Sequence, residues 1–309
     1  MRLAFLYAGQ GSQHVGMGKD LYEANAAFRQ VLDSVDPGFD VKKICFEGPD
    51  EVLTQTQYTQ PCMVAFAAGV TAALYERGIR PEMAAGLSLG EYSALCAAGV
   101  FDAKTAVDLV AFRGKAMAEA VQDRPSAMAA VLMLGREELQ KCCDEASRLG
   151  VAEIANLNCP GQIVIGGDAA AVEEAGRLAK EAGAKRVLPL HVSGPFHTSL
   201  MAPAGRALEE RFKTVTFGPM AFPVYFNCLG APMGEGDTIP GLLVRQVQSS
   251  VHMEDTIRRM EAEGVDTIVE IGPGKALSGF VKKTARSIKT YPVETVEDLE
   301  AVTAALKGE

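Results

Sequence analysis

Strand-like and helix-like stretches alternate along most of the chain, and this alternation limits its fold more than any other feature. Short apolar runs such as Leu3–Tyr7, Met83–Leu87 and Thr267–Ile271 are separated by longer helix-forming runs. Strands separated by helices favour parallel pairing, because a crossover between parallel strands needs about a dozen residues or more. The sequence therefore predicts an α/β fold with a mostly parallel sheet.

Proline and glycine mark the ends of several expected elements. We expect a helix from Pro61 to Arg77, opened by the proline and closed by Gly78, since these residues are favoured at those two ends. A strand is expected over Pro223–Phe226, and further helices over Glu91–Ala98, Ala103–Gln122, Pro240–Val251, Met253–Glu263 and Val296–Leu306.

The middle of the chain follows a different order. Expected strands and helices there are Ala127–Leu134 (strand), Glu137–Leu149 (helix), Ala152–Asn156 and Gln162–Gly166 (strands), Ala171–Ala182 (helix) and Arg186–Leu190 (strand). This β-α-β-β-α-β order is typical of a ferredoxin-like unit. We therefore expect a large α/β domain over 1–124 and 194–309, interrupted by a small inserted domain over 125–193.

Composition and charge exclude several classes of function. The chain has 309 residues and a formal net charge of -9, which argues against a nucleic-acid surface. No stretch near the N-terminus is long enough for a signal peptide or a membrane span. The seven cysteines contain no C-x-x-C pair, so neither a disulfide framework nor a metal site is expected, and a reducing cytoplasm fits best.

An acidic protein partner would need a local basic patch on this acidic chain. The sequence offers Lys185-Arg186 and Lys282-Lys283, with Arg286 nearby. Such short clusters are also common as solvated ends of helices and strands. Both interpretations stay open at this point.

One serine stands between two glycines in Gly86-Leu87-Ser88-Leu89-Gly90, a G-x-S-x-G string. In a nucleophile elbow the serine sits on a sharp turn between a strand and a helix, and the helix N-terminus supplies an N–H group to an oxyanion. The expected strand before and helix after this string fit that context. Ser88 as an ordinary turn residue or N-cap is the alternative.

A serine nucleophile needs a base, and the chain has four histidines. His197 follows a strand broken by glycine and proline, in Ser193-Gly194-Pro195-Phe196-His197, so we expect it to project from the end of an element. His191 is expected to be packed within a strand, and His14 and His252 to flank loops or helix starts. An ordinary surface histidine is the alternative for His197.

Arg113 falls on the apolar stripe of its expected helix, opposite the polar face. A guanidinium that faces a protein core needs an anion, because an unpaired buried charge costs several kcal/mol. That anion is either a protein carboxylate or part of a substrate. Dinucleotide and Walker A motifs are not matched, although the glycine turn around Gln10 could still present backbone N–H groups to an oxyanion.

Taken together, these motifs resemble the malonyl-CoA:acyl carrier protein transacylases of fatty-acid synthesis. The motifs are spread over nearly the whole chain, in the family's order: Ala8-Gly9-Gln10-Gly11-Ser12-Gln13, Gly86-Leu87-Ser88-Leu89-Gly90-Glu91-Tyr92, Arg113-Gly114, Asn158-Cys159-Pro160-Gly161-Gln162, Gly194-Pro195-Phe196-His197-Thr198-Ser199-Leu200-Met201 and Glu270-Ile271-Gly272-Pro273-Gly274-Lys275. The resemblance implies an α/β-hydrolase-like subdomain with an inserted ferredoxin-like one. It also implies a ping-pong transfer of malonyl from malonyl-CoA to the phosphopantetheine thiol of acyl carrier protein, without a bound cofactor.

The resemblance assigns a role to individual residues. Ser88 would be the nucleophile and His197 the base, and the backbone N–H groups of Gln10 and Leu89 would form the oxyanion hole. Arg113 would hold the malonate carboxylate, Phe196 would narrow the pocket against branched acyl groups, and Gln246 would orient His197 through its carbonyl. Lys185, Arg186, Lys282 and Lys283 match basic positions near the expected mouth of the active site.

The chain departs from the family pattern at three places. Leu87 stands where a histidine is usual, Ala8 replaces a frequent proline, and Ser250-Val251-His252-Met253 replaces a Pro-Val-x-Trp stretch. None of these removes a group that the chemistry needs. Two other functions remain to be compared with acyl transfer: a serine thioesterase or esterase, and a carrier-binding module without activity.

Overall fold

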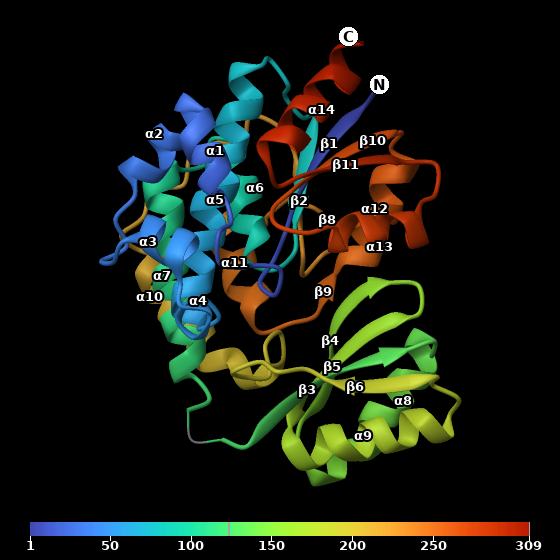
Figure 1. The fold of residues 1–309 in the computed structure, drawn as a ribbon. Coiled ribbons are helices and arrows are strands. Elements are labelled where there is room, and N and C mark those ends of the chain that lie inside the picture. The colour runs from blue at the N-terminus through green and yellow to red at the C-terminus, as the bar shows by residue number, and fades with distance from the viewer. Residues whose placement is uncertain (123, 309) are drawn as a thin grey trace. The chain divides into compact units, whose positions relative to one another are not determined.

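The computed structural model describes residues 1–122 and 124–308, and the chain divides into two compact units. The first unit comprises Met1–Gly114, Thr216–Tyr225 and Arg259–Glu309, and the second comprises Lys115–Val215 and Phe226–Arg258 (Figure 1). The second unit therefore contains the expected insertion, 125–193, together with chain from both sides of it. Domain boundaries at 124 and 194 stay a prediction.

A parallel sheet forms the centre of the first unit. Its strands are β1 (Leu3–Tyr7), β2 (Met83–Gly86), β7 (Val224–Phe226), β10 (Thr267–Ile271) and β11 (Lys289–Val293), in the order β11-β10-β1-β2-β7. All four pairings in this series are parallel, as the alternation of strands and helices predicts. β1, β2 and β10 are buried at every residue, which explains why their sequences are apolar on both faces.

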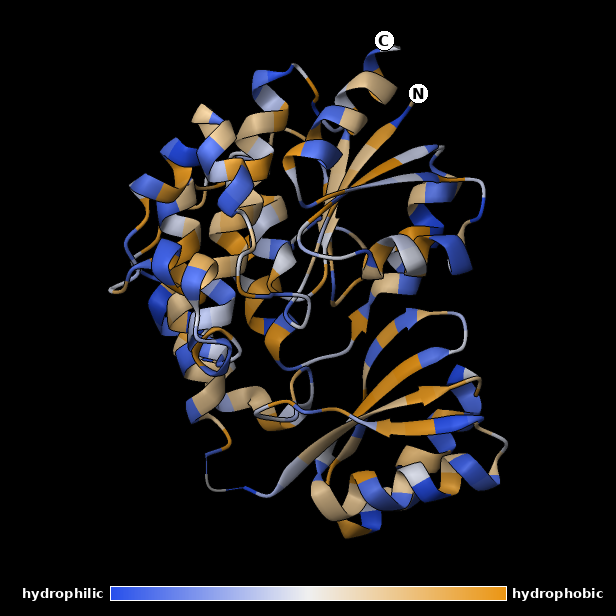
Figure 2. Cartoon of the chain, viewed as in Figure 1, coloured by the Kyte–Doolittle hydropathy of each residue, from blue (hydrophilic) through white to orange (hydrophobic). Residues whose placement is uncertain are grey.

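Two helices pack against the central strands of this sheet: α5 (Thr56–Glu76), which is buried around most of its circumference, and α6 (Gly90–Ala97). Figure 2 shows strands with mainly apolar colours, whereas most helices carry both apolar and polar residues. The other helices of this unit are α1 (Lys19–Ala24), α2 (Ala26–Ser34), α3 (Val41–Glu47), α4 (Asp50–Leu53), α13 (Ala276–Thr284) and α14 (Val296–Lys307), and α7 (Ala103–Glu119) begins in it.

The second unit contains the predicted ferredoxin-like order. Its elements are β3 (Ser126–Leu132), α8 (Arg136–Ala146), the 3-10 helix η1 (Ser147–Leu149), β4 (Ala152–Cys159), β5 (Gln162–Asp168), α9 (Ala169–Glu181) and β6 (Arg186–Pro189). The strands lie in the order β6-β3-β5-β4 and pair antiparallel. α8 and α9 cover one face of this sheet, where Val131, Leu139 and Ile165 belong to one buried cluster (Figure 1).

One strand from the rest of the second unit, β9 (Val251–His252), extends this sheet. The other elements are the 3-10 helix η2 (Ser199–Met201), α10 (Ala202–Phe212), β8 (Ala231–Pro232), α11 (Ile239–Val247) and the start of α12 (Met253–Ala262). β9 pairs parallel with β4, and the Ser250 hydroxyl donates to the carbonyl of Ile154 on β4. This pairing fixes the chain just after α11.

Several expected element boundaries are wrong, and three of them are in the helices α5, α7 and α11. α5 begins at Thr56, so Pro61 lies inside the helix, where packing on most sides compensates for the backbone hydrogen bond that proline cannot make. α7 ends at Glu119, three residues early. α11 ends at Val247, and Val251 belongs to β9, because pairing with β4 is a long-range contact that local sequence does not reveal.

Candidate active site

Ser88 occupies a sharp turn between β2 and α6, as the G-x-S-x-G string predicts. Its backbone is left-handed, with φ 53°, a conformation that costs a non-glycine residue about 1 kcal/mol or more. A Cβ added at Gly86 would lie 2.0 Å from the backbone carbon of Gly90, and one added at Gly90 would lie 2.4 Å from the carbonyl oxygen of Tyr7. Both glycines are therefore required for the strand and helix to approach so closely.

Arg113 is fully buried on α7 and contacts the candidate nucleophile. Its Nη2 donates to Ser88 Oγ at 3.1 Å, its Nη1 donates to Gln60 Oε1 at 2.8 Å, and its Cζ lies 5.6 Å from the Tyr92 ring centroid. These hydrogen-bond acceptors are uncharged. Neither of these two hydrogen bonds of the guanidinium is therefore an ion pair.

Burial lowers the pKa of Arg113 below its ordinary value, while the negative charges that Tyr92 and Glu91 can carry oppose this effect. Glu91 is a buried carboxyl group on α6, and its charge favours the protonated form of Arg113. An arginine keeps its proton under such a shift, since its ordinary pKa lies above 12. The site therefore holds a desolvated cation next to a hydroxyl group.

Gln10 and Leu89 follow the carboxyl ends of two adjacent parallel strands. Tyr7, at the end of β1, is paired with Gly86, at the end of β2, so the loops after both strands leave the same edge of the sheet. The Gln10 side chain donates to Thr56 Oγ1 at 3.1 Å, and Leu89 is the N-cap of α6. Backbone N–H groups in such positions suit an anion, because the N-terminus of a helix carries partial positive charge.

Leu87 takes the position where the family pattern has histidine. It is half-buried, and its side-chain carbons Cγ and Cδ2 lie 3.3 Å from the position of a Cβ added at Gly9. The residue therefore supplies apolar packing between the loops after β1 and β2.

His197 lies in the second unit, in a turn just before η2, and it also has a left-handed backbone, with φ 61°. The side chain is only 4% exposed, and its Nδ1 lies 2.9 Å from the backbone carbonyl oxygen of Gln246. Because a carbonyl can only accept, Nδ1 carries the hydrogen, and in the neutral ring Nε2 is left with its lone pair. That tautomer suits a general base.

The turn that carries His197 is anchored on both sides. Thr198 Oγ1 donates to the carbonyl of Pro195 at 2.6 Å, and the backbone N–H and hydroxyl of Ser199 donate to the Glu153 carboxylate at 2.8 and 2.6 Å. Gln246 is fully buried near the end of α11. The orientation of the imidazole is thus fixed by β4, α11 and its own turn.

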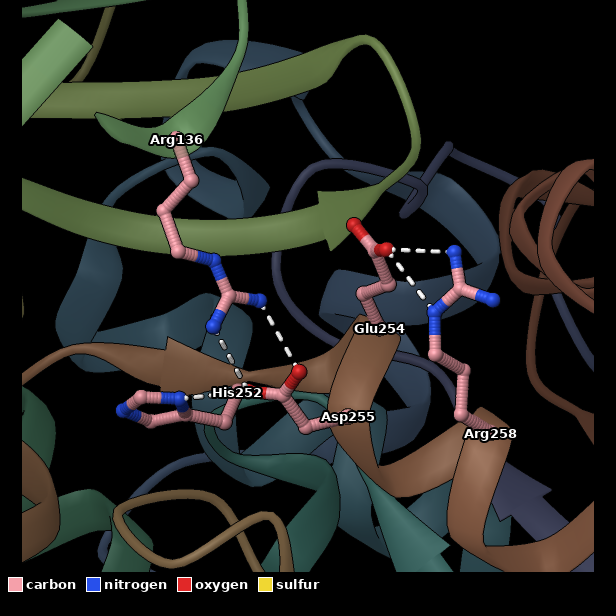
Figure 3. Close-up of polar contacts among 5 residues, drawn as sticks. All are labelled: Arg136, His252, Glu254, Asp255 and Arg258. Carbon is pink, nitrogen blue, oxygen red and sulfur yellow. Dashed lines mark hydrogen bonds and ion pairs between the residues drawn. The ribbon is translucent and has the colours of Figure 1, made fainter. Parts of the chain in front are cut away.

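The other three histidines have different surroundings. His252 Nδ1 lies 2.8 Å from Asp255 Oδ2, and the same carboxylate accepts two hydrogen bonds from Arg136 at 3.2 and 2.9 Å (Figure 3). His14 contacts Glu294. His191 is exposed beyond the end of β6, so its expected packing within a strand is wrong.

The remaining candidate residues are one buried aromatic residue and four exposed cations. Phe196 is buried next to His197, with its ring carbon Cε1 3.3 Å from the position of a Cβ added at Gly194. All four candidate docking residues are exposed; two lie in or beside β6 in the second unit and two on α13 in the first: Lys185, Arg186, Lys282 and Lys283.

The structure thus brings the candidate residues together in two groups, each within its own unit. Ser88 and Arg113 are in contact in the first unit, and His197 and Gln246 in the second. Sequence reasoning missed Gln60 as a partner of Arg113. The signal was hidden by the helix boundary, because a helix that begins at Pro61 would leave Gln60 outside it.

Metal sites and membrane-spanning helices are not found in the described part of the chain. Residues 1–122 and 124–308 contain no group of three or more His, Cys, Asp or Glu side chains that could hold a metal ion. None of the helices described is long and apolar enough to cross a membrane.

Comparison with known proteins identifies the family. Residues 4–304 match the model of the acyl transferase domain. The malonyl CoA-acyl carrier protein transacylase of Bacillus subtilis (strain 168) is 45% identical, with 100% of this chain and 98% of that protein covered.

Solved structures agree with this match. The malonyl CoA-acyl carrier protein transacylase of Clostridium perfringens is 39% identical, with a TM-score of 0.96 and coverage of 100% of this chain and 98% of that one. A chain from the complex of the type II polyketide synthase acyl-carrier protein AntF with its malonyl-transacylase PlMCAT is 37% identical, with a TM-score of 0.95 and full coverage of both chains. The chain therefore belongs to the acyl transferase domain family, and within it to the malonyl CoA-acyl carrier protein transacylases.

Proposed function

We propose that this chain transfers the malonyl group of malonyl-CoA to the phosphopantetheine thiol of an acyl carrier protein, through a malonyl ester of Ser88. The observation that carries the assignment is the hydrogen bond between Arg113 and Ser88. A buried cation beside a serine nucleophile fits an acyl group that ends in a carboxylate, because the two charges pair in a desolvated site. The family's transacylases support the same reaction.

In the first half-reaction Ser88 Oγ attacks the thioester carbonyl carbon while His197 Nε2 takes the hydroxyl proton. The negative charge that develops on the carbonyl oxygen is stabilised by the backbone N–H groups of Gln10 and Leu89. Cleavage of the carbon–sulfur bond leaves malonyl on Ser88, and the leaving CoA sulfur takes the proton from His197.

The second half-reaction repeats these steps with the carrier thiol as nucleophile. His197 takes the thiol proton, the sulfur attacks the malonyl ester, and the proton returns to Ser88 Oγ when the carbon–oxygen bond breaks. Nδ1 keeps its hydrogen throughout, because its N–H donates a hydrogen bond to the Gln246 carbonyl. Gln246 thus replaces the carboxylate of a hydrolase triad.

Selectivity in this proposal depends on two residues. Arg113 holds the malonate carboxylate and rejects donors without one, because its charge would then lack an anionic partner in the acyl pocket. Phe196 narrows the acyl pocket against branched groups. These roles require no bound cofactor.

The acyl carrier protein is proposed to dock on basic residues of each unit: Lys185 and Arg186 in the second, and Lys282 and Lys283 in the first. These four side chains are exposed, and they are cations on a chain with a net charge of -9, so they would attract an acidic carrier locally. A reducing cytoplasm is the proposed location, since the cysteines form no disulfide among the described residues. We also propose 125–193 as a domain inserted into the catalytic domain of 1–124 and 194–309.

Hydrolysis to free malonate is the competing reaction, because a thioesterase would use the same serine. Incubation with malonyl-CoA alone separates the two. We expect a stable mass increase of one malonyl group, lost in Ser88→Ala and kept in Ser93→Ala, a control serine on the neighbouring helix α6. Rapid release of malonate without an adduct would reject the transferase, and an adduct that persists in Ser88→Ala would reject the nucleophile.

A further inference from the structure

The loop that follows β1 is tied to the end of β11 by a charged contact. This loop carries Gln10, and four residues further on His14 Nε2 contacts Glu294 Oε1. The other ring nitrogen, Nδ1, lies 3.1 Å from the carbonyl oxygen of Val15. All of these residues belong to the first unit.

Both ring nitrogens of His14, Nδ1 and Nε2, must donate a hydrogen bond if both contacts are to form. A carbonyl oxygen can only accept, and an ionised carboxylate can only accept, so both contacts are hydrogen bonds only when both nitrogens carry hydrogen. That species is the imidazolium cation. Although partial burial opposes the charge, the hydrogen bonds to Glu294 and Val15 and the charge of Glu294 raise the pKa of His14 above its ordinary value.

Glu294 is itself held in place and binds a second loop. Its Oε2 accepts from the backbone N–H of Gly274 at 2.8 Å, in the loop after β10. Its backbone N–H donates to Asp298 at 3.1 Å, the residue that completes the capping box of α14 with Thr295. The carboxylate therefore joins the loops that follow β1 and β10 to the N-terminus of α14.

The loop from Gly9 to His14 is also bonded internally. The Gly11 N–H donates to Gln13 Oε1 at 2.7 Å, and Ser12 Oγ lies 3.4 Å from the Gly9 carbonyl oxygen. A Cβ added at Gly274 would lie 3.7 Å from the Cβ of Ser12, so the two loops are neighbours. A loop closed in this way transmits a displacement of His14 to the backbone of Gln10.

We propose that protonated His14, held by Glu294, is a positioning residue that keeps the Gln10 N–H group in place for the oxyanion. This inference rests on the proposed function. When His14 loses its proton, one of its two hydrogen bonds and the ion pair are lost together. The loop is then less restrained, and stabilisation of the oxyanion weakens.

Other charged residues lie on the segments that adjoin this contact. Asp298 and Asp20 accept from the backbone N–H groups of Glu294 and Val296. The charged residues of α1, α3, α14 and the loop after β10 are Lys19, Asp20, Glu23, Lys42, Lys43, Glu47, Lys275, Glu297, Asp298, Glu300 and Lys307.

The kcat for malonyl transfer, measured from pH 5.5 to 9, tests the proposal. Wild-type kcat should fall on the alkaline side as His14 loses its proton. His14→Gln should remove the alkaline fall and lower kcat near pH 6.5 by up to about tenfold, a fraction of the effect of deleting an oxyanion donor. His14→Arg keeps a permanent cation, so it should retain kcat at high pH. His191→Gln, an exposed histidine, is the matched control and should keep the wild-type profile.

A titration of the imidazole signals by NMR supplies a readout besides activity. The His14 resonance, assigned by its loss in His14→Gln, should titrate above the ordinary histidine pKa in wild type and return toward it in Glu294→Gln. An alkaline fall that survives in His14→Gln, or a His14 titration that Glu294→Gln leaves unchanged, would overturn the proposal. Malonyl labelling of Ser88 is measured in the same samples. Labelling that persists while the His14 results contradict the proposal would overturn the role of His14 alone, whereas loss of labelling in wild type would overturn the proposed function.

Discussion

Replacement of Arg113 by alanine should convert a malonyl-selective enzyme into one that hardly distinguishes malonyl from acetyl donors. In the structure the guanidinium is fully buried and lies 3.1 Å from Ser88 Oγ, so a bound malonate carboxylate would pair with it away from water. Removing one partner of a buried ion pair costs about 3–5 kcal/mol. At 1.36 kcal/mol per tenfold, kcat/KM for malonyl-CoA should fall by about two to three and a half orders of magnitude.

Acetyl-CoA has no carboxylate, so it gains nothing from the cation. Its kcat/KM should change by less than about tenfold in Arg113→Ala, because the variant mainly removes a charge that acetyl leaves unpaired. The assay measures transfer of each acyl group to a phosphopantetheinylated acyl carrier protein, with both donors run on the same enzyme preparation. Arg136→Ala is the control, because the guanidinium of Arg136 makes bidentate hydrogen bonds to a carboxylate of the protein, that of Asp255 (Figure 3).

The ratio of the two kcat/KM values is the decisive quantity, because a general loss of folded enzyme lowers both donors equally. A fall in the malonyl-to-acetyl ratio of a hundredfold or more in Arg113→Ala, with an unchanged ratio in Arg136→Ala, is the expected result. Equal losses for the two donors would refute the reasoning. The arginine would then serve the elbow structurally, through Gln60 and Ser88, rather than the substrate.

Three other predictions concern stability and are measured by denaturant unfolding. Gly86→Ala should lose several kcal/mol, since its Cβ would lie 2.0 Å from a backbone carbon, whereas Gly135→Ala, whose nearest contact is 3.8 Å, should change little; similar losses would contradict the close-approach argument. Ser88→Gly should be more stable than Ser88→Ala by about 0.5–1 kcal/mol, because glycine accepts the left-handed backbone; the reverse order would remove the claim of strain. Hydrogen bonding to Arg124 outweighs partial burial and lowers the pKa of Asp168, so this carboxylate adds stability above about pH 4 that is lost as pH falls through its folded pKa. The difference in free energy of unfolding between wild type and Asp168→Asn should therefore shrink on acidification, and a constant difference would exclude the linkage.

Local features of the elbow and of the sheet could be predicted from sequence because they depend on nearby residues. The two glycines around Ser88 lie in the turn itself and mark it in the sequence, and an apolar run such as Leu3–Tyr7 indicates a buried parallel strand without reference to its partners. The βαββαβ order of the middle was likewise predicted from element order, and the observed strand order confirms it.

Contacts between distant residues could not be predicted in this way. The apolar stripe indicates that Arg113 is buried, but its partner Gln60 lies 53 residues earlier, on a helix whose start the Pro61 rule misplaced. For His197 the sequence offered four candidates of one residue type. The structure separates His14 and His252, whose rings contact carboxylates, from His197, whose Nδ1 contacts the main-chain carbonyl of Gln246.

Backbone strain occurs both at Ser88 in the first unit and at His197 in the second, although the sequence shows no sign of it. Among the described residues, three non-glycine positions have positive φ: Ser88, Met133 and His197. Met133 is 67% exposed and its N–H bonds to Gly161 at the tip of a hairpin, so a left-handed residue alone does not indicate chemistry. Ser88 and His197 differ from it because Arg113 holds Ser88 Oγ and the Gln246 carbonyl holds the His197 ring at Nδ1, and a strained conformation persists where surrounding contacts fix it. The combination of strain with a fixed, shielded polar atom is therefore what separates the two proposed catalytic residues from an ordinary turn.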